Sequence, residues 1–176
     1  FGNLEQTREY EDASDVTPYR STLFEHSALN LSAWIVTLPT RVSIFQGAPT
    51  AVSAALSSRE FYYDGHEDLE EPPARGLLTR EVRKAAGALT AELTTTYNAA
   101  GNLRTSTDER NKTTTYNWDS ILPEVFLRSV VNPKLQETSY HYTPSGQIDS
   151  VTDVNNVNEH FRYDDMGRLV GSYTGE

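Results

Sequence analysis

Carboxylates are the side chains of this sequence that come closest to a reactive arrangement. The pair Asp164-Asp165 and the group Asp64, Glu67 and Asp68 could supply a general acid and base, or oxygen ligands for calcium. Neither group has the spacing of a calcium-binding loop. Aspartates also start turns by bonding to their own backbone, so we interpret these residues as turn formers and members of a solvated loop.

Histidines and glycines do not form a recognisable catalytic or metal motif. No H-x-H or H-E-x-x-H spacing, nucleophile elbow, phosphate-binding loop or dinucleotide fingerprint occurs. We therefore predict no metal, no cofactor and no enzymatic activity. The histidines are His26, His66, His141 and His160.

Composition excludes further classes. The net charge of -10 over 176 residues argues against a nucleic-acid partner, which needs clustered lysine and arginine. No apolar run approaches the roughly 18 residues of a membrane span. The sequence has no cysteine, which excludes a disulfide scaffold and a thiolate metal site.

A repeated phrase dominates the second half of the chain. A tyrosine is followed four residues later by glycine and two residues after that by an aliphatic residue, at 97–103, 142–148 and 163–169. The chain opens on a shortened copy, Phe1-Gly2-Asn3-Leu4, so we expect a piece of a longer repeat protein. Repeats with a period of about 20 residues are typical of stacked architectures, in which each unit is stabilised by its neighbours.

The pattern from residue 77 onward predicts an antiparallel β-meander, and hence an all-β fold. Threonine-rich and apolar runs alternate with Asn, Asp and Gly turns about every ten residues. We expect strands at 77–83, 89–97, 102–107, 112–118, 125–131, 135–142, 147–152, 157–163 and 168–174. The turn glycines Gly101, Gly146 and Gly167 should have positive φ, and Leu103, Ile148 and Leu169 should anchor the hairpins.

The first third is less regular. Arg41–Phe45 alternates as a strand does, whereas Trp34–Leu38 runs into Pro39, which suggests an edge position or a break between two short strands. The small-residue run from Gln46 to Ser58 is loop-like, and Ala51–Leu56 within it is too short for a reliable helix. An acidic loop follows at 65–73.

No linker divides the chain, so we expect one repeat region over residues 1–176. Within it, 1–60 is irregular β structure, 61–92 a degenerate repeat and 93–176 clear repeats.

The last copy, Phe161-Arg162-Tyr163-Asp164-Asp165-Met166-Gly167-Arg168-Leu169, resembles the tyrosine-aspartate (YD) repeats of the Rhs family. Thr107-Asp108 and Thr152-Asp153 follow their glycines at the same offset and add to the resemblance. It is clear over 93–174 and partial at 61–82. The stretch 38–42 is similar to the Rhs-containing B components of insecticidal toxin complexes.

The resemblance implies that β-hairpins wind into a hollow shell around a toxic polypeptide, in a secreted or cell-surface bacterial protein. The partners would be neighbouring Rhs repeats and the enclosed toxin. Departures from the YD pattern are Asn98 and Thr143 at aspartate positions and Ser120 at the glycine position after Tyr116. The Asp-Pro motif that ends the family's self-cleaving core does not occur.

An alternative is a binding module that recognises a glycan or a cell-surface receptor, as related shells do in adhesion. Tyrosines in the repeats could then stack on sugars, although a repeated aromatic usually packs against the next hairpin. The tyrosines concerned are Tyr97, Tyr116, Tyr142 and Tyr163.

Overall fold

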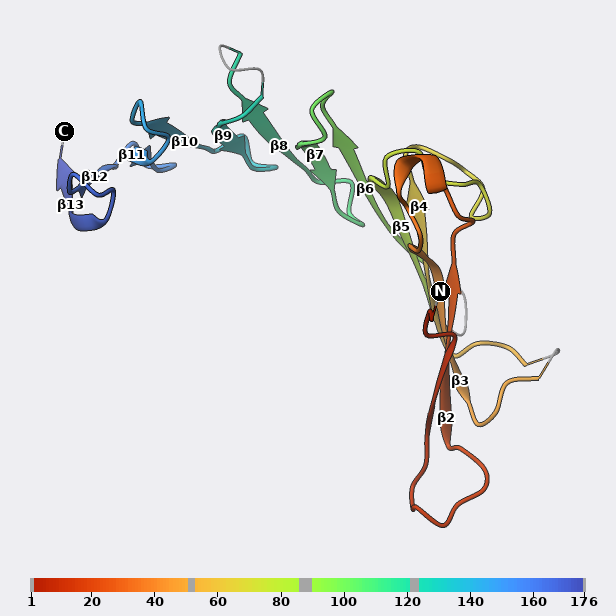
Figure 1. The fold of residues 1–176 in the computed structure, drawn as a ribbon. Helices are drawn as coiled ribbons and strands as arrows, with labels where there is room; N and C mark the ends of the chain where they lie inside the picture. Colours follow the sequence, from red (N-terminus) through yellow and green to blue (C-terminus); the bar gives the residue numbers. More distant parts are fainter. Residues whose placement is uncertain (1, 51–52, 86–89, 121–123, 176) are drawn as a thin grey trace. The chain divides into compact units, whose positions relative to one another are not determined.

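The computed structural model describes residues 2–50, 53–85, 90–120 and 124–175. Its thirteen strands form an antiparallel meander in which strand order follows chain order (Figure 1). The prediction of an all-β meander is confirmed. The sole helix among the described residues is a single 3-10 turn, η1 (Leu31–Ala33).

The strands are short, as expected for runs of β-branched and aromatic residues that Asx turns and glycines interrupt. Their bounds are β1 Gln6–Glu9, β2 Arg20–His26, β3 Pro39–Gln46, β4 Ser57–Tyr63, β5 Leu78–Ala85, β6 Thr90–Tyr97, β7 Leu103–Thr107, β8 Thr113–Trp118, β9 Leu127–Val131, β10 Glu137–Tyr142, β11 Ile148–Thr152, β12 Asn158–Tyr163 and β13 Leu169–Gly175.

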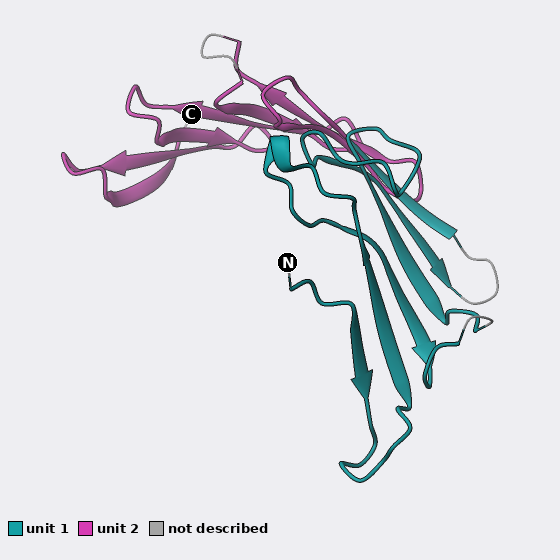
Figure 2. Cartoon of the chain, turned by 45° about the vertical axis from the view of Figure 1, so that its right-hand side comes forward, with its two compact units in different colours: residues 1–95 teal, residues 96–176 magenta. Residues whose placement is uncertain are grey.

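The chain forms two compact units, residues 1–95 and 96–176 (Figure 2). In the first unit β1 to β6 pair in succession, and in the second β7 to β13 do the same. The prediction of one repeat region over 1–176 stays a prediction.

From β5 onward the observed strands lie within two residues of the predicted ones, and the strand expected at Arg41–Phe45 lies inside β3. The expectation of strand structure over Trp34–Leu38 is wrong, because this run lies in the loop between β2 and β3 and Pro39 begins β3. Strands β1 and β2 were not predicted. The run at 51–56, which is too short for a reliable helix, includes residues outside the described ones, as does the shortened copy at 1–4.

Alternation along the strands gives the second unit two unlike faces. Residues paired across strands share a face, so one face carries most of the large apolar and aromatic residues, with Thr138 and Glu159 between them: Tyr116, Trp118, Val130, Tyr140, Tyr142, Val151, Phe161 and Tyr163. The opposite face carries mainly small polar residues, together with Val131 and Tyr173: Thr105, Thr115, Ser129, Ser139, Ser150, Thr152 and His160.

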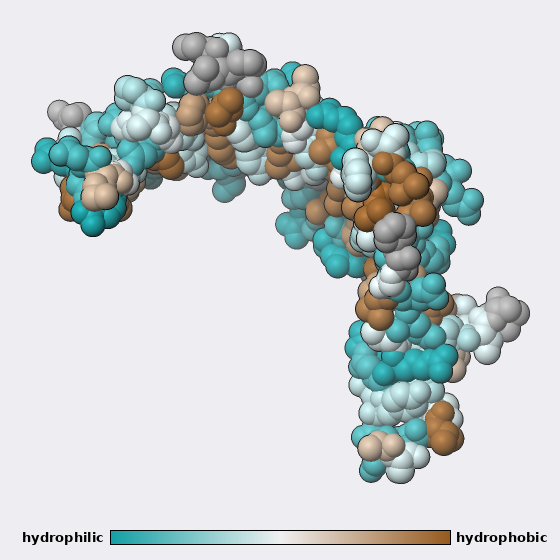
Figure 3. Space-filling view, in the orientation of Figure 1, coloured by the Kyte–Doolittle hydropathy of each residue, from teal (hydrophilic) through white to brown (hydrophobic). Residues whose placement is uncertain are grey.

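Neither unit has a conventional hydrophobic core. Val82 is the one buried hydrophobic residue in the part of the chain that the structure describes, whereas several serines are buried, namely Ser21, Ser43, Ser129 and Ser150. Apolar residues accordingly reach the surface of both units (Figure 3). Cross-strand and hairpin-to-hairpin contacts must therefore supply most of the stability.

Candidate functional site

The second unit places an aromatic residue at the end of β8, β10 and β12, just before a turn. Each of these side chains donates a hydrogen bond to a backbone carbonyl of the preceding hairpin. Trp118 Nε1 donates to the Leu103 oxygen at 2.8 Å, Tyr142 Oη to that of Leu127 at 2.9 Å and Tyr163 Oη to that of Ile148 at 2.9 Å. We name the turns that begin at Asn98, Asp119, Thr143 and Asp164 the aromatic edge.

A β-bulge precedes each of these aromatic residues. The register shifts between Asn117 and Trp118, between His141 and Tyr142, and between Arg162 and Tyr163. Across each bulge the aromatic residue faces the aliphatic anchor of its own hairpin, Leu127, Ile148 or Leu169. The ring thus packs within its own hairpin and bonds to the previous one, because a bulge re-aims a side chain and bends the strand.

A second set of contacts joins the same turns. Asn102 Nδ2 donates to the carbonyl of Glu124, and Gln147 Nε2 donates to that of Gly167 at 2.7 Å. Between them, the rings of Phe126 and Tyr142 lie 4.7 Å apart in a tilted arrangement. Successive turns of the aromatic edge are therefore linked side chain to backbone or ring to ring.

The first residue of each turn stabilises its backbone as the Asx-turn interpretation expects. Asp164 Oδ1 accepts from the amides of Met166 and Arg168 at 3.0 and 2.9 Å. The hydrogen bond from the Arg168 amide is the main cause that lowers the pKa of Asp164 below its ordinary value. Asn98 and Thr143 replace aspartate in the pattern and still accept, from Asn102 and Gln147 respectively.

The predicted turn glycines are confirmed. Gly101, Gly146 and Gly167 have φ of 93°, 86° and 78°. A Cβ on Gly146 would lie 3.3 Å from the Phe126 ring, and one on Gly167 would lie 2.9 Å from Gln147 Nε2. At Gly146 the close approach of the Phe126 ring therefore favours glycine in addition to φ, whereas at Gly167 the flexible end of Gln147 would have to move.

The interpretation of Tyr116 and Ser120 as the aromatic and glycine positions of one repeat is wrong. Trp118 ends β8, and Asp119 begins the turn by accepting from the amides of Val125 and Phe126. The left-handed position is filled by Glu124, with φ of 64°. The turn is longer than in the other repeats, so the glycine spacing measured from Tyr116 identified the wrong residue.

The turns at the other end of the strands form the opposite edge of the second unit. They have the same backbone hydrogen bonds, but no hydrogen bond or ring contact joins one turn to the next among the described residues. The loops at 108–112, 132–136 and 153–157 repeat the backbone bonds of the aromatic edge. Their left-handed residues are Asn111, Leu135 and Asn156, with φ of 57°, 61° and 61°.

The first unit repeats the aromatic contact at Tyr63, whose Oη donates to the Pro39 carbonyl at 2.8 Å. Burial raises the pKa of Tyr63 to about 12, so its hydroxyl stays a donor. Asp64 follows and accepts four backbone amides, those of residues 74–77, at 2.8 to 3.0 Å. Burial of Asp64 would raise its pKa, but these four hydrogen bonds outweigh it and hold the pKa below its ordinary value.

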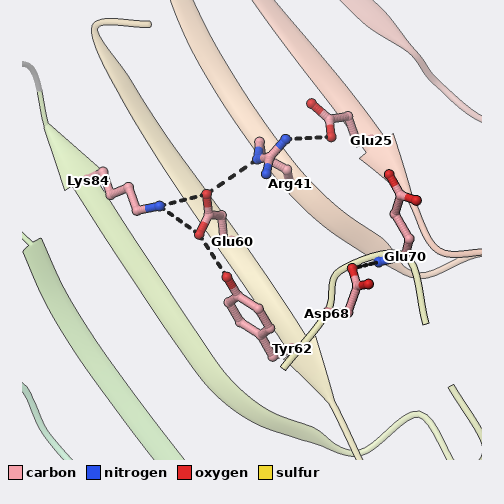
Figure 4. Close-up of polar contacts among 7 residues, drawn as sticks. All are labelled: Glu25, Arg41, Glu60, Tyr62, Asp68, Glu70 and Lys84. Carbon is pink, nitrogen blue, oxygen red and sulfur yellow. Dashed lines mark hydrogen bonds and ion pairs between the residues drawn. The ribbon is translucent and has the colours of Figure 1, made fainter. Parts of the chain in front are cut away.

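A charged network crosses the first unit on the face that carries Glu60 (Figure 4). Glu60 is 6% exposed and accepts from Lys84 Nζ at 2.8 and 2.9 Å and from Tyr62 Oη at 3.0 Å. Arg41 forms an ion pair with Glu60 at 3.4 Å and another with Glu25 at 2.9 Å. Burial alone would raise the pKa of Glu60, but hydrogen bonds from Lys84 and Tyr62 and the charges of Lys84 and Arg41 lower it.

Beside this network lies a depression of about 860 Å³, which we name the acidic depression. Its charged lining consists of Glu25, Arg41, Glu67, Asp68 and Glu70. Asp68 and Glu70 come from the loop after β4, which Figure 4 shows next to the strands that carry Tyr62 and Glu25.

The carboxylates first considered as catalytic or calcium-binding are used in other ways or lie apart. Asp64 is saturated by backbone amides, Asp68 Oδ1 accepts from the Glu70 amide at 3.0 Å, and Asp165 is exposed. Among the described residues no group of three or more His, Asp or Glu side chains could hold a metal ion. In the same residues, no helix has the length and apolar character to span a membrane.

The repeat tyrosines do not form one uniform ladder. Tyr142 and Tyr163 bind carbonyls of neighbouring hairpins, and Trp118, which sequence reasoning missed, does the same in place of Tyr116. The Trp118-Asp119 pair was the available signal, since it has the aromatic-acid order of Tyr163-Asp164. These contacts favour packing over sugar stacking for Trp118, Tyr142 and Tyr163.

Solved structures with the same fold exist. The chain is similar to the crystal structure of the TcdB2-TccC3-Cdc42 complex, with a TM-score of 0.52 and 16% identity over 88% of this chain. It is also similar to a structure of the Photorhabdus luminescens Tc holotoxin pore, with a TM-score of 0.51 and 16% identity over 88% of this chain. TcdB2-TccC3-TEV matches 95% of the chain with a TM-score of 0.52 and 16% identity.

At 16% sequence identity, the similarity to these structures shows a shared fold. The chain spans only 8 to 9% of the solved chains that it matches. No protein-family model matches the sequence, and no curated protein matches it.

Proposed function

We propose that the chain is a structural segment of a wall of stacked β-hairpins that encloses a polypeptide cargo. The observation that carries the proposal is the aromatic edge, where each aromatic side chain bonds to the hairpin before it. Each of these bonds joins only adjacent hairpins, so further hairpins of the same kind can be added to the wall without limit. The fold shared with the TcdB2-TccC3 structures and the resemblance to Rhs repeats support the same role.

The proposal includes no catalytic step and no cofactor. Its partners are neighbouring hairpins of the same wall and an enclosed toxic polypeptide, and its setting is a secreted or cell-surface bacterial protein. A wall segment needs partners at both outer strands, because β1 and β13 each pair on one side only among the described strands.

Limited proteolysis tests the proposal. A longer protein that includes this segment should co-purify with a polypeptide that resists protease until the wall is denatured. Residues 1–176 alone should be less resistant or associate through their open edges, which light scattering would detect. A 176-residue chain that is monomeric, cooperative and as resistant as the longer protein, and that binds glycans on an array, would instead support the adhesion module.

A further inference from the structure

We propose that the acidic depression of the first unit is a docking site for an arginine-rich segment of a polypeptide. The proposal does not depend on the wall function, because it concerns one local surface of residues 25–70. It rests on the charge of the lining, on a buried hydroxyl group without a partner, and on the size of the depression.

The lining has a strong negative balance. Four carboxylates, those of Glu25, Glu67, Asp68 and Glu70, face one guanidinium, that of Arg41, which gives a net charge of −3 with His26 counted as neutral. Arg41 is already paired with Glu25 and Glu60 and offers little attraction to an anion. In the residues that the structure describes, Glu67 and Glu70 have no cationic side chain within ion-pair distance.

Ser27 provides an independent sign of a missing partner. It lines the depression and is only 9% exposed, yet its Oγ makes no hydrogen bond within the described chain. An unpaired buried hydroxyl group carries a free-energy cost, which a ligand N–H would remove by donating to it. A cationic N–H group satisfies both this oxygen and the carboxylates around it.

Size and geometry favour arginine over a metal ion. A volume of about 860 Å³ is far larger than one cation needs, and no group of described side chains could hold a metal. A guanidinium presents five donors in a flat fork that matches carboxylates two at a time. Carboxylates from β2 and from the loop at 67–70 can then be bridged by successive arginines of one segment.

Calorimetric titration with a tetra-arginine peptide tests this site in the 176-residue chain. The triple variant Glu67→Gln, Asp68→Asn, Glu70→Gln should raise Kd about tenfold or more, because it removes three charges that face the peptide. The matched control is Glu109→Gln, Glu137→Gln, Glu159→Gln, which makes the same change in net charge at exposed positions of the second unit. It should change Kd less than about twofold. Thermal melts of both variants check that folding is retained.

The outcomes separate a local site from general attraction to an acidic protein. Equal weakening by the two triple variants, or no saturable binding at low salt, would overturn the proposal. Spermine should bind more weakly than the peptide, since ammonium groups lack the bidentate fork. Spermine binding as tight as the peptide's would contradict the assignment to an arginine segment. Ser27→Ala should weaken peptide binding a further few-fold without changing the control behaviour.

Discussion

The two edges of the second unit have turns of the same kind, but the contacts between successive turns differ. On both edges the turn begins with a residue that accepts backbone amides, such as Asp164 on the aromatic edge and Asp153 on the opposite edge. Both edges also have a left-handed residue near the end of each turn, one position before the last in all of them except the longer turn that begins at Asp119. On the aromatic edge hydrogen bonds and a ring contact join neighbouring turns, and on the opposite edge no such bond or ring contact joins the described turns.

This difference bears on which turns carry glycine. Asn111, Leu135 and Asn156 adopt φ near 60° in turns with the same hydrogen bonds, so the turn alone does not demand glycine. Gly146 and Gly167 instead lie where a Cβ would meet Phe126 or Gln147 of the preceding turn. Close approach between hairpins adds to the preference for glycine at these two positions, whereas Glu124 fills the left-handed position of the longer turn on the same edge.

The largest effect expected from this comparison is that of Gly167→Val. It places a β-branched residue at φ of 78° and pushes a Cβ against Gln147, so it should destabilise by about 1 to 3 kcal/mol. The matched control is Gly65→Val, where φ is 81° and no atom lies within 4 Å of the added Cβ. Urea unfolding measures both. Equal losses at the two positions would show that close approach is unimportant.

The next effect concerns the links between hairpins. Tyr142→Phe and Tyr163→Phe each remove one hydroxyl bond to a neighbouring carbonyl and should each cost about 1 kcal/mol. Tyr173→Phe serves as a control, because Tyr173 is 48% exposed and its ring contacts involve no hydroxyl bond. Hydrogen exchange should report faster opening of the hairpin pair on either side of the lost bond. A loss as large for Tyr173→Phe would argue against a specific role of the edge.

On the opposite edge the expected sign reverses. Leu135 is 85% exposed and has φ of 61°, an uncommon conformation for a bulky residue. Leu135→Gly should relieve this strain and stabilise by about 0.5 kcal/mol, after the greater freedom of glycine in the unfolded chain is subtracted. A thermal melt that shows destabilisation would contradict the view that this edge is unconstrained by neighbours.

The regular half of the fold could be predicted from sequence because its signals are local. Threonine and aromatic runs predict strands, and a residue such as Asp153 or Asp164 stabilises its own turn without help from distant residues. The bulges and the bonds from Trp118, Tyr142 and Tyr163 could not be predicted, since they depend on which carbonyl a neighbouring strand presents. The repeat was misaligned at Tyr116 because the turn after Asp119 is longer than its counterparts.

The first unit was harder to predict for the same reason. Strands β1 and β2 lack a repeated phrase, and the order of their pairing fixes them more than their own sequences do. The network around Glu60 joins β2 to β5, and its members are up to 59 residues apart in sequence, from Glu25 to Lys84. The sequence offered no spacing by which to connect them.

The smallest expected effect is a difference in pH dependence between a turn of the first unit and a turn on the opposite edge of the second. Asp64 accepts four backbone amides and Asp153 on the opposite edge accepts two, and both have a pKa lowered below the ordinary value of 3.8. A carboxylate with a lowered pKa in the folded state adds stability above its ordinary pKa, and this stability is lost as pH falls through the folded value.

The urea midpoint of the unaltered chain should therefore fall as pH decreases from 5 to below 3.8. Asp64→Asn should lower the midpoint at pH 7 and flatten this decrease, because the amide side chain cannot ionise. Asp153→Asn should act in the same direction but less strongly, since fewer amides depend on it. If Asp153→Asn flattened the pH profile as much as Asp64→Asn, the count of backbone bonds would not explain the difference between the turns. The loop at 64–77 would then be held mainly by its other contacts, such as the bond from Asn30 Nδ2 to the Pro73 carbonyl at 2.9 Å.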